Sequence, residues 1–342
     1  MNLKEFAQIV GMSQTTVSRA LNGHPEVSER TRARILAEAR RLGYSPNTYA
    51  RSLAMGHGQV IGCMIPAHGR DEIVNPIYAD FLAGVGAVCA QRRFDINLSV
   101  VPDLDDPETY RGLKSKGMVG GVIVQFPRVN DPRPALLSQI GLPFVVHGRV
   151  SQCDTPYSWV DVNNRRAFER AAGFLIQLGH RDIALLNGDE TLDFAHRRRD
   201  GVVAALRDSG LSPDPARMFS GDMTVAYGYS HARKLLAQDR PPTAILCAAT
   251  MIAIGVQQAA QQAGLQLGRD LSVLTFDDDL SYYSNPETEP VFTAMRSPVR
   301  AHGQCIADVL LTKVTTGDDA PVSKLFEAEL VVGQSTAPPA RG

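Results

Sequence analysis

The chain has 342 residues, 44% of them apolar and 21% charged, which is the composition of a globular protein and excludes wholesale disorder. Its net charge is −1 and its mean hydropathy is −0.11, and no run of about 18 apolar residues occurs, which excludes a membrane-spanning helix. The length predicts two or three domains, and the lack of a secretory signal pattern at the start favours the cytoplasm.

Charge is distributed unevenly along the chain. Residues 1–60 hold eight Lys or Arg against four Asp or Glu, a balance of +4, so the remaining residues carry a balance of −5. A small basic head on a larger acidic body is typical of a polyanion-binding module attached to a separate domain.

Three short helices are predicted in the basic head. Apolar residues recur at helical spacing through residues 3–10. Ser13 is a good N-cap for a helix over residues 14–21, and Ser28 caps a third over residues 29–42. Two short helices joined by a tight turn and followed by a third are the layout of a helix-turn-helix, whose second helix reads the major groove of DNA.

The second predicted helix carries the side chains that such reading needs. Arginine can bond guanine, glutamine can bond adenine, a threonine methyl can touch thymine, and hydroxyl groups suit phosphate. A three-helix cap with a polar outer face is the alternative, but these residues fall where a groove-reading helix needs them. The expected DNA contacts in the head are Ser13, Gln14, Thr15, Thr16, Ser18, Arg19 and Asn22.

A fourth helix is predicted over residues 47–55, with Ser45 as its cap and Pro46 in its first turn. A helix of fewer than about ten residues is marginal in isolation. Placed between a DNA-binding head and a larger body, it would form a natural order–disorder switch.

The run from residue 3 to residue 56 resembles the N-terminus of the lactose-repressor/galactose-repressor (LacI/GalR) family of bacterial transcription regulators, most specifically in V-S-R-A-L-N-G and L-G-Y-S-P-N-T-Y-A-R-S-L. The resemblance implies that the fourth helix is a hinge helix that folds on the operator. It also implies that Asn47, Ala50 and Leu53 contact DNA there, with Leu53 inserted between bases in the minor groove. Without the resemblance, Leu53 reads as an ordinary apolar contact.

Short apolar runs alternate with helical patterns in the acidic body. Such runs, rich in Val, Ile and Leu, predict buried parallel sheets in a doubly wound α/β architecture, and about 280 residues favour two lobes with a cleft. The expected strands are Val60–Ile65, Ile96–Val101, Gly121–Phe126, Phe144–His147, Ile183–Leu186, Ala244–Cys247, Val273–Phe276 and Phe292–Met295. The expected helices are Tyr78–Arg92, Arg166–Leu178, Arg198–Asp208, Tyr229–Leu236 and Ile252–Ala263.

The resemblance continues more thinly into the body through Asn75–Tyr78, Gly179–Leu186 and Ser272–Asp278. It implies an effector domain similar to periplasmic sugar-binding proteins. The expected domains are a helix-turn-helix at 1–45, a hinge helix and linker at 46–58, an effector-binding and dimerisation domain at 59–334, and a disordered tail at 335–342. Lobe 1 would span about 59–160 and 290–320, lobe 2 about 161–289 and 321–334, with crossings near Asp161, Pro290 and Ala320.

Candidate effector contacts follow from the resemblance. Arg198 opens an R-x-x-G pattern and Asp277 follows a strand, so the two could bond vicinal hydroxyls across a cleft while aromatic rings cover a sugar face. From the residues alone, Arg198 reads as a surface cation and Asp277 as a helix cap. Tyr78, Gln125, Arg198 and Asp277 match effector contacts of the family. The expected set is completed by the aromatic Phe194, by His147 and Arg149 after a strand at the cleft edge, and by Thr250. Ala249-Thr250 departs from the Asn-Asp or Ser-Ser of many family members, which weakens any choice of sugar.

A ligand-responsive repressor of a carbohydrate uptake or catabolism operon is the expected function. A regulator that responds to a purine or a sugar phosphate, a sugar-binding protein and an α/β enzyme are the alternatives. Residues 84–89 lack the third glycine of a dinucleotide loop and residues 228–232 the final glycine of a nucleophile elbow. We therefore expect no catalytic residues and no cofactor. The five scattered cysteines predict neither disulfides nor a metal site.

The expected partners are double-stranded operator DNA, a mono- or disaccharide effector and a second copy of the chain, without a membrane. The Pro-rich tail has no leucine heptads, so a dimer rather than a tetramer is expected. The sequence leaves open whether the ligand acts as inducer or corepressor.

Overall fold

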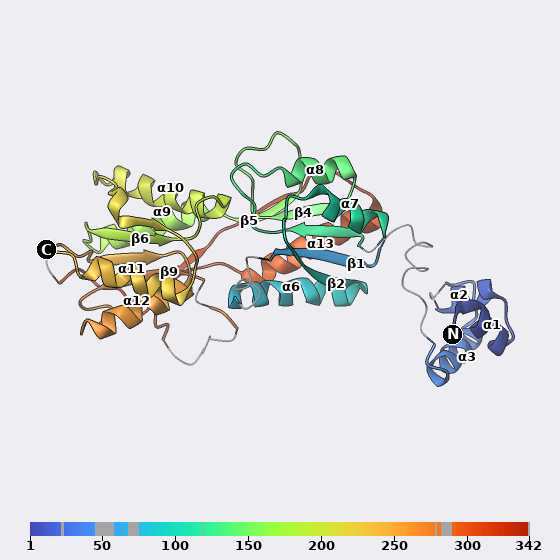
Figure 1. Ribbon diagram of the computed structural model, residues 1–342. Coiled ribbons are helices and arrows are strands. Elements are labelled where there is room, and N and C mark those ends of the chain that lie inside the picture. The colour runs from blue at the N-terminus through green and yellow to red at the C-terminus, as the bar shows by residue number, and fades with distance from the viewer. Residues whose placement is uncertain are drawn as a thin grey trace.

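The computed structural model describes residues 1–21, 24–44, 58–67, 75–117, 119–277, 279–281 and 289–340, and the statements below concern these residues. Figure 1 shows a three-helix head at one end of the molecule and two lobes beyond it. The hinge helix predicted over residues 47–55 lies outside the described residues, as do the expected DNA contacts Asn22, Asn47, Ala50 and Leu53.

The head forms the three helices that local signals predict. They are α1 (Leu3–Val10), α2 (Gln14–Leu21) and α3 (Glu29–Arg41). The Ser13 Oγ accepts a hydrogen bond from the Thr16 amide at 3.1 Å, and Ser28 caps α3 in the same way. Phe6, Val17 and Ile35 are fully buried and join the three helices in one core.

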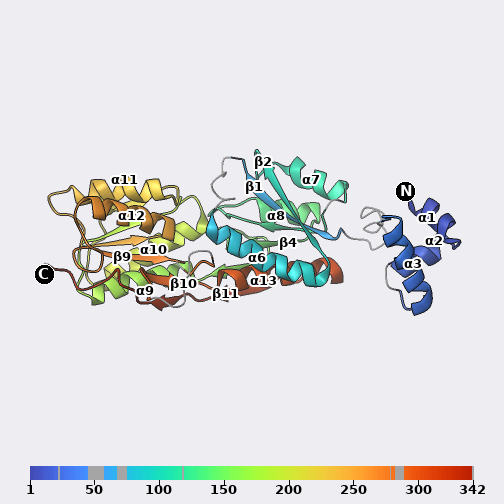
Figure 2. The ribbon, with the colours of Figure 1, turned by 90° about the horizontal axis from the view of Figure 1, so that it is seen from below.

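Lobe 1 is a six-stranded parallel sheet with helices on both faces. Its elements are β1 (Val60–Pro66), α6 (Pro76–Arg92), β2 (Asp95–Val101), α7 (Pro107–Ser115), β3 (Gly121–Val124), α8 (Arg133–Ile140), β4 (Phe144–His147), β5 (Trp159–Val162), α13 (Val299–Thr316) and β11 (Ser323–Phe326). The strand order is β11-β5-β4-β3-β1-β2. Helices α6 and α13 lie side by side on one face, and α7 and α8 cover the other (Figure 2).

Lobe 2 repeats this arrangement. Its elements are α9 (Asn164–Gln177), β6 (Ile183–Asn187), α10 (Asp193–Asp208), the 3-10 helix η1 (Pro215–Arg217), β7 (Met218–Ser220), α11 (Val225–Leu236), β8 (Ala244–Cys247), α12 (Thr250–Gln262), β9 (Ser272–Phe276), β10 (Thr293–Arg296) and β12 (Glu329–Val331). The strand order is β12-β10-β9-β8-β6-β7, and β12 runs antiparallel to β10. Helices α9 and α10 pack together, as do α11 and α12.

All eight predicted strands are confirmed, with boundaries within two residues. The predicted helices of the body are confirmed as well, although two of them begin several residues earlier than expected. Eight further elements were not predicted, namely α7, α8, α13, η1, β5, β7, β11 and β12. Three of the four missed strands, β7, β11 and β12, lie at sheet edges and have no fully buried residue, so they form no continuous apolar run. The fourth, β5, is interrupted by Asp161.

The chain crosses between the lobes three times, and two of the predicted crossing points are wrong. The first crossing follows β5, close to the predicted Asp161. The crossing predicted at Pro290 comes only after Arg296, because β10 still pairs with β9 in lobe 2. The crossing predicted at Ala320 comes only after Phe326, because β11 still pairs with β5 in lobe 1.

The prediction of a disordered tail from residue 335 is wrong for residues 335–340. The Ser335 hydroxyl is buried, donates to the Val273 carbonyl at 2.5 Å and accepts from the Thr293 amide at 2.8 Å. The His180 Nε2 lies 2.9 Å from the Ala337 carbonyl oxygen. These contacts fix the tail to lobe 2 although its composition is Pro-rich.

Candidate functional site

The exposed face of α2 presents the predicted DNA contacts. Gln14, Thr15 and Arg19 are exposed, whereas Val17 and Ala20 of the same helix are buried in the head. The Thr16 hydroxyl lies 2.8 Å from that of Ser13 and is partly buried, as is Ser18. The structure therefore places all six described candidates, Ser13, Gln14, Thr15, Thr16, Ser18 and Arg19, on α2 or at its start.

Arg19 is held by an exposed carboxylate. Its Nη1 lies 2.6 Å from Glu26 Oε2, and about half of each side chain is accessible. Ion pairs between exposed side chains contribute little to stability. The guanidinium can therefore exchange Glu26 for a base edge or a phosphate at small cost.

A cavity of about 150 Å³ lies between the two lobes, at the carboxyl ends of strands from both sheets. Ligands of open α/β sheets bind at this end of the strands. Its polar lining consists of Asn75, Tyr78, Gln125, His147, Asp161, Asn164, Arg198, Asp277, Ser297 and His302. Six of the eight predicted effector contacts line it, namely Tyr78, Gln125, His147, Phe194, Arg198 and Asp277.

Arg198 is buried beside this cavity and is not the surface cation that its residue type alone suggests. Its Nε donates to Asn164 Oδ1 at 2.8 Å, and its Nη1 donates to the Ala248 carbonyl at 2.7 Å. The guanidinium carbon lies 4.1 Å and 4.8 Å from the ring centres of Phe276 and Phe194. Burial lowers the pKa of Arg198 to about 10, against the opposing effect of nearby carboxylates, so the group stays charged at neutral pH.

Asp277 lies in a strained loop rather than at a helix start. Its φ of 53° is in the left-handed region, which residues other than glycine rarely adopt. Its Oδ1 accepts from the Ser297 amide at 2.7 Å, and its carbonyl accepts from the Thr250 hydroxyl at 3.0 Å. Thr250 does not line the cavity, but it holds the loop that presents Asp277 to it.

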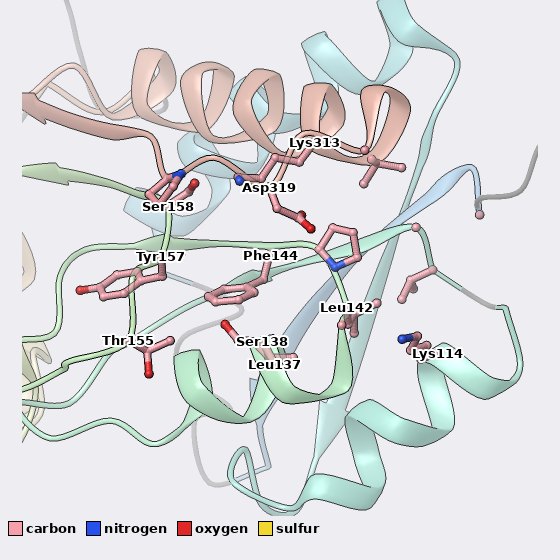
Figure 3. Close-up of a pocket in the computed structure, with 18 of the residues that line it drawn as sticks. Lys114, Leu137, Ser138, Leu142, Phe144, Thr155, Tyr157, Ser158, Lys313 and Asp319 are labelled. Atoms are coloured by element: carbon pink, nitrogen blue, oxygen red, sulfur yellow. The ribbon is translucent and has the colours of Figure 1, made fainter.

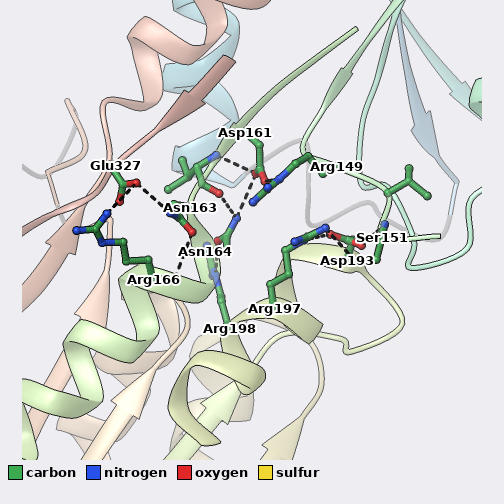
Figure 4. A network of polar contacts seen from close by, with 12 residues as sticks. Arg149, Ser151, Asp161, Asn163, Asn164, Arg166, Asp193, Arg197, Arg198 and Glu327 are labelled. Atoms are coloured by element: carbon green, nitrogen blue, oxygen red, sulfur yellow. Dashed lines mark hydrogen bonds and ion pairs between the residues drawn. The ribbon is translucent and has the colours of Figure 1, made fainter. Parts of the chain in front are cut away.

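Arg149 also lies outside the cavity lining and reaches it through Asp161. Its Nε donates to Asp161 Oδ2 at 2.7 Å (Figure 4). Its guanidinium carbon lies 5.1 Å from the ring centre of Trp159. The other oxygen of Asp161 accepts from Asn164 Nδ2 at 3.2 Å. This chain of contacts joins Arg149, Asp161, Asn164 and Arg198 in one buried polar network.

Hydrogen bonds connect the lobes on both sides of the cavity. On one side the Ser151 amide of lobe 1 donates to Asp193 Oδ2 of lobe 2 at 2.7 Å, and Arg197 donates to the Ser151 hydroxyl at 2.9 Å (Figure 4). On the other side the Ser281 amide, beyond β9, donates to Asp80 Oδ2 of α6 at 2.8 Å. The angle between the lobes is thus held by polar contacts that a ligand could reinforce or break.

Two histidines form the lobe 1 wall of the cavity. The ring of His147 stacks on Phe81 at 4.3 Å, and its Nδ1 lies 3.4 Å from Gln125 Oε1. Burial lowers the pKa of His147 to about 4. Burial, and to a lesser extent the neighbouring His147, lowers that of His302 to about 3. Both imidazoles are therefore neutral at pH 7.

These shifted values predict a loss of stability in mild acid. In the unfolded chain both histidines are protonated below about pH 6.5, whereas in the folded chain His147 is protonated only near pH 4 and His302 only near pH 3. The unfolded state therefore binds more protons in this range, so the free energy of unfolding is highest above about pH 6.5 and falls as the pH is lowered. Each histidine can remove up to about 1.4 kcal/mol of unfolding free energy per pH unit in this window. Urea unfolding at pH 7, 5.5 and 4.5 measures the loss. A His302→Leu variant should show a shallower decline, and an unfolding free energy that stays constant from pH 7 to 4.5 would contradict the prediction.

Asn164, Asp161 and His302 line the cavity but were not predicted from the sequence. Asn164 and Asp161 flank the first crossing between lobes, where the short β5 was missed, and His302 lies on the missed helix α13. A polar residue at the start of a helix, such as Asn164, reads as a cap. His302 carries no motif by which it could have been found.

A larger hollow of about 940 Å³ lies at the opposite end of lobe 1, where the strands begin and where Gly58 enters the body (Figure 3). Its floor is apolar and includes Leu137, Leu142 and Phe144. The Lys313 Nζ on its wall donates to the Ala320 carbonyl at 2.8 Å and so secures the loop after α13. None of the predicted effector contacts lines this hollow, and the smaller cavity between the lobes has the converging buried polar groups of a binding site.

Within the described ranges, no group of three His, Cys, Asp or Glu side chains is arranged to hold a metal ion. Among the helices that the structure describes, none has the length and apolar character needed to cross a membrane.

Comparison with known families gives two matches. Residues 2–47 match a family described as bacterial regulatory proteins, lacI family, and residues 172–336 match a periplasmic binding protein-like domain. These ranges correspond to the three-helix head and to most of lobe 2 with α13.

Similar proteins match over nearly the whole chain. The HTH-type transcriptional regulator AglR of Rhizobium meliloti (strain 1021) is 42% identical over 339 residues, covering 99% of this chain and 95% of the relative. The HTH-type transcriptional regulator RafR of Escherichia coli is 33% identical, with 91% of each chain covered.

Two solved structures match 98% of this chain and 99% of their own. The lac repressor dimer bound to operator and the anti-inducer ONPF has a TM-score of 0.81 at 25% identity. The transcriptional regulator CelR in complex with cellobiose has a TM-score of 0.72 at 26% identity.

Proposed function

The chain belongs to the lacI family of bacterial regulatory proteins, and we propose that this transcriptional regulator represses a carbohydrate uptake or catabolism operon under the control of a sugar bound between its lobes. The observation that supports a sugar ligand is the composition of the cavity. Arg198, Asn164 and Asp277 of lobe 2 line it together with Gln125, His147 and His302 of lobe 1. The complex of CelR with cellobiose supports a sugar as the class of ligand.

The cavity has the two features that sugar recognition needs. Charged and amide groups can bond several hydroxyls at once, and charge-assisted hydrogen bonds are the stronger ones. Rings of Phe194, Phe276 and Tyr78 supply apolar surface for the ring of a sugar. The rings of Phe194 and Phe276 lie beside Arg198, so one ligand could contact both kinds of group.

Binding of DNA is assigned to the exposed face of α2. In our proposal a homodimer in the cytoplasm places two copies of Gln14, Thr15 and Arg19 in the major grooves of a near-palindromic operator. Asn47, Ala50 and Leu53 contact the minor groove between the two half-sites, as the resemblance of that segment implies.

Control of DNA affinity follows from the position of the cavity. A ligand that bonds lobe 1 and lobe 2 together selects one angle between them, and it can shift DNA affinity only by its differential affinity for the arrangements with and without DNA. Lobe 1 is the lobe to which the head is attached, so a change of lobe angle in a dimer moves the two heads relative to each other.

Fluorescence anisotropy of labelled operator DNA tests this function. The operator is first obtained by selection from random duplexes with the full-length protein. A sugar is then titrated into the complex, and a monotonic fall or rise in bound DNA distinguishes an inducer from a corepressor. Failure to select any DNA sequence would refute the regulator, whereas selection without a response to any small molecule would refute ligand control alone.

Arg19 provides a sharper test of the DNA-binding surface. An Arg19→Ala variant should lose about 1–3 kcal/mol of operator binding free energy and relax base preference at one position of each half-site. Glu26→Gln is the matched control, because it removes the partner of Arg19 but keeps the guanidinium. The assignment fails if binding-site selection returns the same preference for Arg19→Ala as for the parent chain.

A further inference from the structure

Gln125 and His302 place buried polar atoms on the lobe 1 wall of the cavity. Gln125 and His302 are 2% and 3% exposed, and within the part of the chain that the structure describes neither Gln125 Nε2 nor His302 Nε2 has a hydrogen-bond partner. Buried polar groups in native proteins are nearly always paired, so these two, which line a cavity, are available to bond whatever molecule occupies it. The two residues come from different elements, the end of β3 and the helix α13.

The charges around the cavity do not favour an anion. Its lining contains two carboxylates, those of Asp161 and Asp277, and among the described lining residues one permanent cation, Arg198. Arg198 already donates to Asn164 and Ala248, and the imidazoles of the lobe 1 wall are neutral at pH 7. The charge of Arg198 is already offset by Asp277 and Asp161, so a phosphate or a second carboxylate would add an uncompensated negative charge to the buried site.

We infer that the effector is an uncharged sugar and that Gln125 Nε2 and His302 Nε2 are the lobe 1 groups that read its hydroxyls. This inference rests on the proposed function of the cavity. An amide nitrogen donates to a hydroxyl oxygen, and a neutral imidazole nitrogen either donates to a hydroxyl or accepts from it. Sugar phosphates, sugar acids and nucleotides are the ligand classes that it excludes.

The same two residues set specificity. A site built to bond a hydroxyl rejects an analogue without it, because the buried group of the protein then stays unpaired. Gln125 is fixed by the contact of its Oε1 with His147, and the ring of His302 lies 4.4 Å from that of Phe326, so neither side chain can easily turn towards another partner.

Thermal unfolding of the full-length protein with matched ligands tests the charge of the effector. The panel holds glucose, glucose 6-phosphate and glucuronate, galactose and galacturonate, and the disaccharides cellobiose, maltose and sucrose. We expect at least one uncharged member to raise the unfolding midpoint, and no charged member to do so at the same concentration. A larger shift with a charged member, or no shift with any uncharged one, would overturn the inference.

Measuring operator binding with the same preparation distinguishes a failure of the inference about the effector from a failure of the proposed function. A protein that binds its selected operator but responds only to a charged sugar refutes the inference and leaves the regulator intact. A protein that shows neither operator binding nor a ligand response refutes the proposed function itself.

Variants of His302 test the residue assignment with the sugar found in the panel. His302→Leu should weaken sugar binding at least about tenfold, whereas His302→Gln, which can place a nitrogen near the same point, should retain it. The unliganded midpoint of His302→Leu should equal or exceed that of the parent, because an unpaired buried atom is removed. Gln304→Leu, an exposed position on the same helix, is the matched control.

Gln125→Met is the second variant, and it removes the other unpaired nitrogen at nearly constant volume. It should weaken sugar binding as His302→Leu does, even where His302→Leu itself fails to fold. Sugar binding of parental strength in both folded variants would overturn the assignment of these residues.

Discussion

An Arg198→Met variant should bind operator DNA as the parent chain does and no longer respond to the sugar. Among the described residues that line the cavity, Arg198 is the one permanent cation, and its bonds to Asn164 and the Ala248 carbonyl fix the position of its guanidinium. Methionine fills similar space among the phenylalanine rings but offers no donor. We expect the sugar concentration for half response to rise at least roughly 100-fold, which corresponds to about 3 kcal/mol for hydrogen bonds to a charged group.

Arg199→Met is the matched control for this experiment. Arg199 is the next residue of α10, but its Nη1 lies 2.6 Å from Glu190 Oε2 and the residue does not line the cavity. It should respond to the sugar like the parent, as measured by operator anisotropy. An Arg198→Met protein with a normal sugar response would show that the cavity is not the effector site. Circular dichroism and the unfolding midpoint establish that each variant is folded.

A Gly201→Ala variant should lose about 1–3 kcal/mol or more of unfolding free energy. Gly201 is the glycine of the R-x-x-G pattern, and it lies where α10 crosses α9. A Cβ there would lie 2.1 Å from the Arg165 carbonyl oxygen and 2.9 Å from the Glu169 amide nitrogen. The clashing atoms belong to the backbone of α9, which cannot move aside as the end of a flexible side chain can, so α9 and α10 must separate. Overpacking of this kind lowers the unfolding free energy by about 1–3 kcal/mol or more.

Gly173→Ala supplies the opposite result in the same helix pair. Gly173 lies in α9, and a Cβ there would meet no atom within 4 Å. Replacing a helical glycine by alanine without a clash should stabilise the protein by up to about 1 kcal/mol. Urea unfolding of both variants measures the difference. Equal stability of the two variants would mean that the close approach of α9 and α10 is not needed.

Gly201→Ala should also weaken the sugar response, because Arg198 of α10 is positioned by its hydrogen bond to Asn164 of α9.

The head could be predicted almost completely because its signals are local. The caps of α2 and α3 act within three residues of their helix, and the apolar positions of α1 follow helical spacing. Eight of the twelve described strands were also found, since buried parallel strands read as continuous apolar runs. The assignment of DNA contacts to α2 stays a prediction, and it is compatible with the exposure of Gln14, Thr15 and Arg19 on that helix.

The binding cavity was only partly predictable. Arg198 and Asp277 stood out through the R-x-x-G pattern and the end of a strand, and both line the cavity. His302 and Asn164 did not, because the elements that present them meet only through contacts between residues far apart in the chain. The same holds for the tail, where Ser335 is ordered by Val273 and Thr293, which no local composition reveals.

The late return of the chain to lobe 1 has a consequence for synthesis on the ribosome. The apolar core on one face of the lobe 1 sheet needs Ile306, Leu310 and Leu311 of α13, and the sheet is completed only by β11 at residues 323–326. The rest of that sheet is made before residue 163, so the growing polypeptide must carry an uncovered apolar surface while all of α9 to α12 is translated. Transiently exposed surface of this kind is prone to aggregate. Lobe 1, although it is begun first, can therefore be completed only after α13 and β11 have been made.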